Sequence, residues 1–401
     1  MRIAAPSVRI CRQTRRSPSL PRVRVVIAKK LLSTIGGSEA LARSLDRELR
    51  ALGHDVTLVG LRPAWTRPGV PPETRAAPPG PVTIHANGSH FVFVPARGGR
   101  IGAAIDGLFP TALVGAEDLR RVVAGAYVVH SIAREWAGPL ERAARSAGAA
   151  FVETPLVHPG QPFSGAGAGD VARYRRDDAV IALTEWEAGW YRERGIDHVH
   201  VTGIGPNLHA LPEIAREEAV ILFVGRRERY KGYHALRAAA PLVWAERPDA
   251  RFVTIGQAAW NAFLDRGGRD PRWIDRGIVS EAEKAEAYAR ATIFAMPSEH
   301  ETFGFTYLEA WSAGLPVIAG DIAPLREVVR EGVDGLHVRN EPRAIADAIL
   351  ALLRDPERAR RMGTAGREKV SRDFSWPAVA RRTEVAYASA VSLRDGRRAP
   401  T

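Results

Sequence analysis

Cysteine is nearly absent from this chain of 401 residues, since Cys11 is the single one. A lone cysteine cannot form a disulfide within the chain or build a thiolate metal site, so both are excluded and a reducing compartment is expected. The sequence also lacks the run of about 18 consecutive apolar residues that a membrane-spanning helix needs. We therefore expect a cytoplasmic protein. The one form of membrane association that we keep open is peripheral contact at the inner face of a membrane.

Lysine is scarce, and the basic charge is carried almost entirely by arginine. Of 57 basic residues five are lysines: Lys29, Lys30, Lys231, Lys284 and Lys369. The net charge is +12, with +9 on residues 1–200 and +3 on the remainder. Residues 1–24 hold seven arginines and no acid, and we interpret residues 1–22 as a disordered basic tail rather than a targeting or phosphate-binding segment. Because the rest is only mildly basic, we expect no nucleic-acid partner.

The length and a hydrophobic content of 45% favour two globular domains. Short β-branched runs alternate with helical patterns, beginning with VRVVIA, a glycine loop, ALARSLDRELRALG and VTLVG. This order predicts an α/β fold with two Rossmann-like, doubly wound parallel sheets facing a central cleft. The expected divisions are an amino-terminal domain at 23–202, a linker at 203–218, a carboxyl-terminal domain at 219–375 and a helix at 376–392.

A glycine-flanked basic loop, GRRERYKG, follows the predicted strand AVILFVG. Ligands of doubly wound sheets bind at the carboxyl ends of the strands, which is where this loop begins. The guanidinium of Arg226 and the ammonium of Lys231 could both reach one diphosphate, each charge-assisted hydrogen bond contributing about 1.5–3 kcal/mol. The alternative is a solvated basic loop, so this spacing is weak evidence by itself.

The segment EHETFGFTYLEAWSAGLPV runs from a loop into a helix. Gly304 permits close approach of a ligand to the backbone, and the free amides at the start of the helix form a ready anion site. Glu301 lies in the loop and Glu309 in the helix, so both carboxylates can face one cleft and hold hydroxyl groups. The alternative is a helix start decorated with acids to suit its dipole, and this is our interpretation of Glu299.

The amino-terminal half offers a glycine pair and two histidines. Gly36 and Gly37 occupy the first strand-to-helix turn, where their amides would face a phosphate or simply form a tight turn. They do not complete the G-x-G-x-x-G pattern of dinucleotide sites. His130 ends the predicted strand AYVVHS, and His158 follows FVET. Both histidines should lie at the rim of the cleft, where an imidazole can hold or deprotonate an acceptor hydroxyl.

Together these segments resemble the retaining glycosyltransferases of family four, also called group 1, which have the two-domain GT-B fold. The resemblance spans roughly residues 23–390. It rests on IGGSEALARSLDRELRALGHDVTLV, on FVGRRERYKG, and above all on the E-x7-E block PSEHETFGFTYLEAWSAGLPVIA. In that block the pattern falls on Glu301, Phe303, Gly304 and Glu309.

The resemblance implies a hexosyltransferase-like enzyme that binds a nucleoside-diphosphate sugar mainly through its carboxyl-terminal half. Its implied donor-binding residues are Gly36, Gly37, Arg226, Lys231, Phe303, Gly304, Phe305, Thr306 and Glu309. Glu301 would hold hydroxyls of the donor sugar and Glu309 those of the ribose. No metal ion or other cofactor is implied, because Arg226 and Lys231 take the place of a cation.

The acceptor side remains open at this stage. Leu156 stands where the histidine of the family would first align, and His158 follows two positions later. The catalytic candidates are therefore Glu301, His158 and His130, and the acceptor is a small molecule, a glycan or a lipid. Two other hypotheses compete: a nucleotide-sugar or dinucleotide binding protein of similar fold without transfer activity, and a binder of anionic surfaces through the tail.

Overall fold

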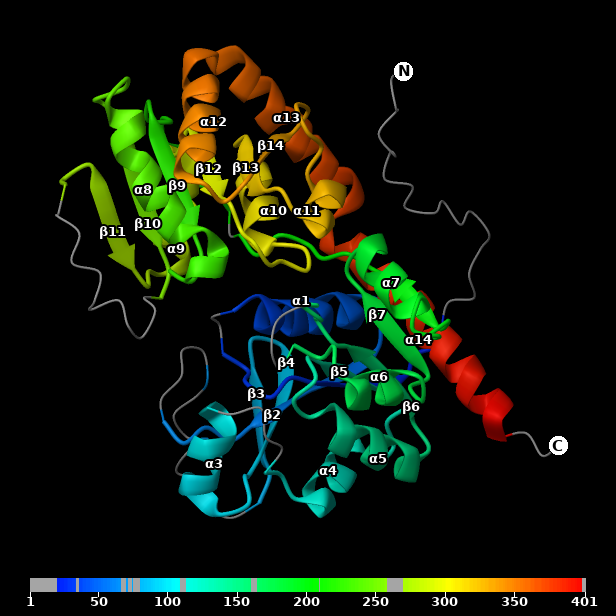
Figure 1. Ribbon diagram of the computed structural model, residues 1–401. Coiled ribbons are helices and arrows are strands. Elements are labelled where there is room, and N and C mark those ends of the chain that lie inside the picture. Colours follow the sequence, from blue (N-terminus) through cyan, green and yellow to red (C-terminus); the bar gives the residue numbers. More distant parts are fainter. Residues whose placement is uncertain are drawn as a thin grey trace, which may run out of the picture.

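The architecture was analysed in a computed structural model, which describes residues 20–33, 36–65, 70, 74, 80–108, 113–159, 164–208, 210–257 and 270–398. Two α/β domains lie one above the other in Figure 1, with the amino-terminal domain below. The predicted doubly wound fold is confirmed. Most of the predicted basic tail, residues 1–19, lies outside the described residues.

The amino-terminal domain is built on a sheet in the order β3-β4-β2-β1-β5-β6-β7-β8. All neighbours pair in parallel except β3 and β4, which form an antiparallel hairpin. The central strands are buried along their whole length and mostly apolar, as expected for a parallel sheet covered on both faces. The strands are β1 (Arg24–Ala28), β2 (Asp55–Leu61), β3 (Val82–Ala86), β4 (Ser89–Val94), β5 (Val128–Ile132), β6 (Ala150–Thr154), β7 (Ala179–Ala182) and β8 (Val199–Val201).

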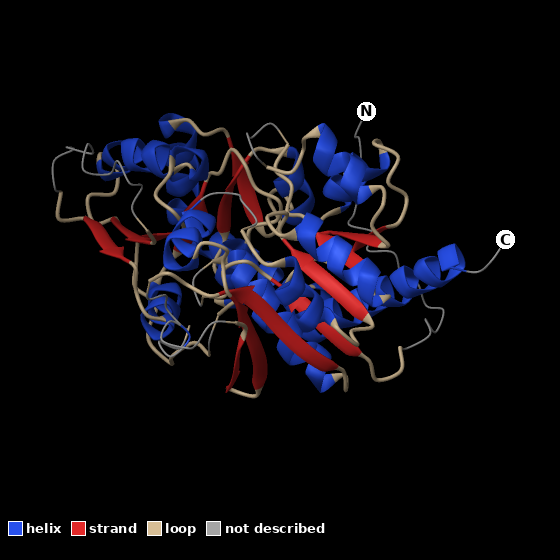
Figure 2. Ribbon diagram, turned by 90° about the horizontal axis from the view of Figure 1, so that it is seen from below, coloured by secondary structure: helices blue, strands red, loops and turns tan. Residues whose placement is uncertain are grey.

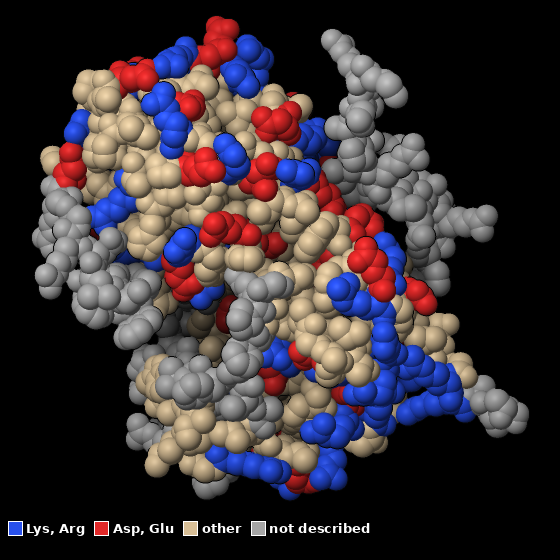
Figure 3. All heavy atoms as spheres, in the orientation of Figure 1, with Lys and Arg blue, Asp and Glu red and all other residues tan. Residues whose placement is uncertain are grey.

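Helices connect these strands, as parallel pairing requires. They are α1 (Gly37–Ala51), α3 (Gly99–Leu108), α4 (Ala116–Val123), α5 (Ala137–Ala147), α6 (Ala168–Tyr174) and α7 (Glu185–Arg192). Figure 3 shows lysine and arginine side chains gathered over the lower domain, whereas basic and acidic side chains are mixed over the upper one.

The carboxyl-terminal domain has a six-stranded parallel sheet in the order β11-β10-β9-β12-β13-β14. The first strand of this domain, β9, pairs with β10 on one side and β12 on the other, so the strand order reverses between β9 and β12. Ligands of doubly wound sheets bind at such a switch point. The strands are β9 (Val220–Val224), β10 (Arg251–Ile255), β11 (Trp273–Gly277), β12 (Ile293–Met296), β13 (Val317–Gly320) and β14 (Gly335–Val338).

The run GIVS at 277–280 has the pattern of a short strand but does not form one. β11 ends at Gly277, Ile278 is 59% exposed, and Ser280 caps the next helix. A short apolar run without burial cannot be told from a loop by its pattern. The helical elements here are the 3-10 turn η1 (Arg229–Lys231), α8 (Tyr233–Trp244), α9 (Glu281–Arg290), α10 (Phe305–Ser312), α11 (Ala323–Val328), α12 (Pro342–Arg354) and α13 (Pro356–Asp373).

The last helix, α14 (Trp376–Arg398), leaves the carboxyl-terminal domain and packs on α1, β6 and β7 of the other domain (Figure 1). Figure 2 shows its end projecting beyond the domain at the carboxyl terminus. At its start the indole N–H of Trp376 donates to the carbonyl of Pro206, 2.8 Å away. Between β8 and β9 the described residues form neither helix nor strand. The two domains are therefore joined twice, through this segment and through α14.

Candidate active site in the cleft between the domains

Two loops meet at the switch point of the carboxyl-terminal sheet. One follows β9 and leads into η1 and α8, and the other follows β12 and leads into α10. Gly232 has a φ of 76°, and a Cβ there would collide with the carbonyl oxygen of Pro297. Only glycine allows the two loops to pack this closely. The residues that each loop carries are thus held against one another.

The closest polar contact between these loops joins Lys231 to Glu301. The Lys231 ammonium pairs with Glu301 Oε1, which also accepts a hydrogen bond from Ser298 Oγ at 3.3 Å. The exposed fractions of the two side chains are 17% and 7%. A partly buried pair with a free edge can exchange partners when a ligand arrives, the ammonium turning to an anion and the carboxylate to a hydroxyl.

Arg226 lies further out, with 59% of its side chain exposed. Its guanidinium contacts the Tyr230 hydroxyl and pairs with Glu228 Oε1 at 3.2 Å. Burial raises the pKa of Tyr230 to about 12, so this hydroxyl keeps its proton. The charged groups of Arg226 and Lys231 lie 5.5 and 5.2 Å from the centre of the Tyr230 ring. The predicted pair of cations is therefore brought together.

Glu309 lies deeper than the sequence suggested. It is 3% exposed, and its oxygens accept from the Lys284 ammonium at 3.2 Å and the Tyr288 hydroxyl at 2.8 Å. Burial raises the pKa of Glu309, and Lys284 opposes that rise. Lys284 also donates to the backbone carbonyl of Asn207 in the interdomain segment, at 2.9 Å. Sequence reasoning missed Lys284 and Tyr288, although Lys284 is one of only five lysines and the scarcity of lysine was a usable signal.

The start of α10 faces the other domain. Gly304 adopts a φ of 90° as the helix cap, which a larger residue would adopt only with strain. Phe305 contacts Trp376, with ring centres 6.4 Å apart, and the Thr306 hydroxyl lies 3.6 Å from the Met296 sulfur. The amides at this helix start remain candidates for anion binding.

Phe303, which was expected to help bind the donor, is 3% exposed and packs edge-on against Phe374, with ring centres 5.2 Å apart. Its side chain therefore packs in the core where α13 ends.

Gly36 and Gly37 lie opposite α10. Gly36 has a φ of 116° and precedes α1, and a Cβ built on Gly37 would lie 2.7 Å from the Phe305 ring. The amino-terminal ends of α1 and α10, from different domains, therefore meet across the cleft. Figure 3 shows a hollow between the two domains on this side of the molecule.

His158 also reaches this place. Its ring nitrogens both lie 3.3 Å from the hydroxyl of Thr302, the residue after Glu301. Burial is the main cause that lowers the pKa of His158, and the positive charge of Lys231 adds to it, while Glu301 acts in the opposite direction. A neutral imidazole facing a carboxylate across a cleft can accept a proton from, or orient, a hydroxyl group.

His130 is not at the rim, and that prediction is wrong. It is completely buried inside β5, where its ring nitrogens bond to the hydroxyls of Tyr387 in α14, at 2.8 Å, and Thr154, at 2.7 Å. Burial lowers its pKa to about 3, so it stays neutral. The arrival of α14 on the sheet turns a strand-end histidine into part of the core.

Among known proteins, residues 206–369 match the sequence family described as Glycosyl transferases group 1. The chain is 32% identical over 200 residues to alpha-maltose-1-phosphate synthase of Mycolicibacterium smegmatis, covering 46% of this chain and 51% of that protein. It is 34% identical over 192 residues to D-inositol 3-phosphate glycosyltransferase of Segniliparus rotundus, covering 46% and 42%. The matches thus span about half the length of these curated relatives.

Solved structures resemble the whole chain. Sucrose-phosphate synthase from Thermosynechococcus elongatus superposes with a TM-score of 0.71 at 19% identity, covering 90% of this chain and 97% of that one. Anabaena HepE, solved with UDP-glucose bound, gives 0.70 at 15% identity, covering 92% and 100%. At such identities the likeness concerns the fold. The chain thus has the GT-B fold, and residues 206–369 match the group 1 family that the sequence motifs resemble.

Proposed function

We propose that this protein is a glycosyltransferase that moves a sugar from a nucleoside-diphosphate sugar to a hydroxyl-bearing acceptor, with retention of the anomeric configuration. The observation that carries the proposal is the Lys231–Glu301 pair at the switch point of the carboxyl-terminal sheet, with His158 opposite it. Support comes from the group 1 domain match and from the UDP-glucose bound by the structural neighbour HepE.

In this proposal the diphosphate lies between the cations and the start of α10. Arg226 and Lys231 donate to its oxygens, and the amides of Gly304, Phe305 and Thr306 add neutral donors. Stabilising the charge that develops on the leaving diphosphate is the largest electrostatic contribution such a site can make. We propose that these groups replace a metal ion, so that a chelator leaves transfer unchanged.

The carboxylates hold the donor in place. Glu301 accepts hydrogen bonds from hydroxyls of the sugar once Lys231 turns to the phosphate. Glu309, already held by Lys284 and Tyr288, accepts from the ribose with its remaining lone pairs. His158 orients the acceptor hydroxyl toward the anomeric carbon, and the Gly36–Gly37 turn closes the phosphate side.

The experiment is a panel of nucleotide sugars. Thermal shift identifies the donor, because a ligand at 100 times its Kd stabilises the fold by about 2.7 kcal/mol. Release of nucleoside diphosphate is then followed with sugar, polyol and lipid acceptors, and the product anomer is assigned by NMR. A protein that binds a donor but releases no diphosphate with any acceptor would be a binding protein of similar fold, and the proposal would fall.

A further inference from the structure

The loop that carries His158 contains a strained residue. Leu156 has a φ of 60°, in the left-handed region that residues other than glycine and asparagine seldom occupy. Such a conformation costs roughly 1–3 kcal/mol and persists only where neighbouring contacts hold it. Residues 156–158 must therefore be held in place by neighbouring contacts.

Glu187 in α7 is one of them. Its side chain is buried, and Oε1 accepts hydrogen bonds from the Val157 amide at 3.4 Å and the Tyr191 hydroxyl at 3.1 Å. The other oxygen, Oε2, accepts from the Leu183 amide at 2.8 Å. The Glu187 amide in turn donates to Thr184 Oγ1, which caps the helix. One carboxylate thus ties the residue beside His158 to the first turn of α7.

The same turn of α7 is bound by the other domain. Glu327 in α11 accepts hydrogen bonds from the amides of Glu185 and Trp186, each at 2.8 Å through a different carboxylate oxygen. These are amides that the helix itself cannot satisfy, and a negative charge there is favoured by the helix dipole. The contact between α7 and α11 therefore joins the two domains directly.

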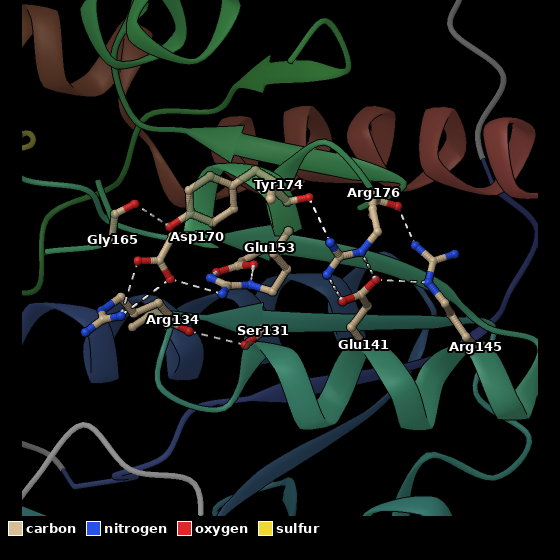
Figure 4. Close-up of polar contacts among 12 residues, drawn as sticks. Ser131, Arg134, Glu141, Arg145, Glu153, Gly165, Asp170, Tyr174 and Arg176 are labelled. Atoms are coloured by element: carbon tan, nitrogen blue, oxygen red, sulfur yellow. Dashed lines mark hydrogen bonds and ion pairs between the residues drawn. The ribbon is translucent and has the colours of Figure 1, made fainter. Parts of the chain in front are cut away.

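The far side of the His158 loop is anchored within the amino-terminal domain, as Figure 4 shows. The Tyr174 hydroxyl donates to the Gly165 carbonyl at 2.9 Å, and Arg173 in the same helix pairs with Glu153 of β6 at 3.0 Å. Asp170 links this helix to Arg134 after β5. These contacts do not depend on the carboxyl-terminal domain, which reaches this segment through the direct contact of Thr302 with the His158 ring and through the Glu187 anchor.

We propose that α7 couples the approach of the two domains to the position of His158. Glu327 binds the first turn of α7 and thereby fixes that turn against the carboxyl-terminal domain. Glu187 bonds the same turn to Val157, so a well-ordered turn keeps Val157 and its neighbour His158 in place. Glu187 is then a positioning residue and touches no substrate. The catalytic consequence rests on the transferase function proposed above, whereas the mechanical coupling does not.

Burial raises the pKa of Glu187 to about 7. The nearby Glu327 carboxylate adds to this rise, whereas the hydrogen bonds from Leu183, Tyr191 and Val157 oppose it. An amide at this position therefore resembles the neutral acid that the site already tolerates. Glu187→Gln keeps the shape but replaces one accepting oxygen by a donor, and Glu327→Gln does the same at the domain contact.

The structural experiment is hydrogen exchange of the full chain, read at the amides of Leu156, Val157 and His158. Loss of one anchoring bond should speed exchange by about tenfold, the equivalent of roughly 1.4 kcal/mol. We expect this in Glu187→Gln and also in Glu327→Gln, which changes a residue of the other domain. Glu193→Gln is the control, since this residue at the C-cap of α7 has a side chain that is 77% exposed. Unchanged exchange in Glu327→Gln overturns the coupling, and unchanged exchange in Glu187→Gln overturns the anchor.

The kinetic experiment uses the donor found in the panel above. Glu187→Gln and Glu327→Gln should lower kcat by about tenfold with donor KM within twofold, and neither should lower it further in a His158→Ala background. Additive losses in that background would overturn the positioning role. If the unmodified protein transfers no sugar, the proposed function fails while the exchange experiment still decides the coupling.

Discussion

The two sheets each have a point where strand order reverses, and the two points are built differently. In the carboxyl-terminal domain, β9 and β12 lead into glycine-bearing loops that present Arg226, Lys231 and the start of α10. In the amino-terminal domain, β1 and β5 flank Lys29, whose ammonium lies 3.8 Å from Glu39 and 3.7 Å from Glu135.

The difference lies in how charge is balanced at the two places. A cation that faces one carboxylate, beside an exposed arginine and free amides, suits an anion such as a diphosphate. A buried lysine between two carboxylates faces more negative charge than its own positive charge. The amino-terminal edge therefore attracts a phosphate less strongly. The comparison favours the donor on one side of the cleft and a hydroxyl-bearing acceptor on the other.

The largest effect is expected from removing the cation of the donor side. Lys231→Ala should weaken binding of the nucleoside diphosphate about 10- to 150-fold, because one charge-assisted interaction is lost and Glu301 is left without its partner. Isothermal titration calorimetry measures this. Arg229→Ala removes the same charge from an exposed position of the same loop and should bind normally. Equal losses in both variants would mean that general positive charge, not this site, attracts the ligand.

On the acceptor side, His158→Ala should lower the rate of transfer much more than the affinity for the donor. We expect kcat to fall about 100-fold, within the range of a lost acid–base or orienting group, while donor affinity changes little. Steady-state kinetics and calorimetry on the same preparation supply both numbers. A variant that loses donor affinity instead would place His158 on the donor side.

The contact between the sides can be tested at Gly37. In Gly37→Ala the new methyl group would lie 2.7 Å from the Phe305 ring, so the helix starts must separate. We expect about a tenfold loss of kcat/KM that Phe305→Leu partly restores, since both changes act at one contact. Gly169→Ala, where a Cβ meets nothing within 4 Å, is the control. Failure of the second substitution to restore activity would argue that the two helix starts do not touch during the reaction.

The smallest effect at neutral pH is expected from His130, which lies in the core and not in the cleft. Its folded pKa of about 3 is below the ordinary value of 6.5, so the stability that its neutral form supports is present above pH 6.5 and lost as the pH falls toward 3. Between pH 6.5 and 5.5 this amounts to about 1 kcal/mol. Urea unfolding of His130→Gln should show a correspondingly shallower loss of stability with acid. An identical pH slope in both proteins would show that His130 is solvated in the fold.

Sequence reasoning grouped the residues of the proposed donor side, because they are close along the chain. Arg226 and Lys231 lie in one loop, and Glu301, Gly304 and Phe305 lie in another, so chain connectivity alone limits how far apart they can be. It failed to predict how deeply some of these side chains are buried. Nothing in the segment TYLEAW shows that Glu309 is sealed by Lys284 and Tyr288 from α9, or that Phe303 is covered by Phe374.

Within the part of the chain that the structure describes, no helix combines the length and the hydropathy needed to cross a membrane. This agrees with the absence of long apolar runs in the sequence. The acceptor panel should therefore include lipids presented in vesicles beside soluble sugars and polyols, because the apolar content of the chain does not choose among them.

By itself, the sequence determined the two doubly wound domains, the loops at the carboxyl ends of β9 and β12, and the residues able to hold a diphosphate, because periodicity and short motifs act over neighbouring residues. Only the tertiary structure decided between the two histidines. Tyr387, 257 positions along the chain from His130, covers that ring when α14 crosses back. His158 lies at the cleft, where its ring meets the Thr302 hydroxyl of the other domain. Burial is a property of what packs on a residue, and the packing partners come from distant parts of the chain.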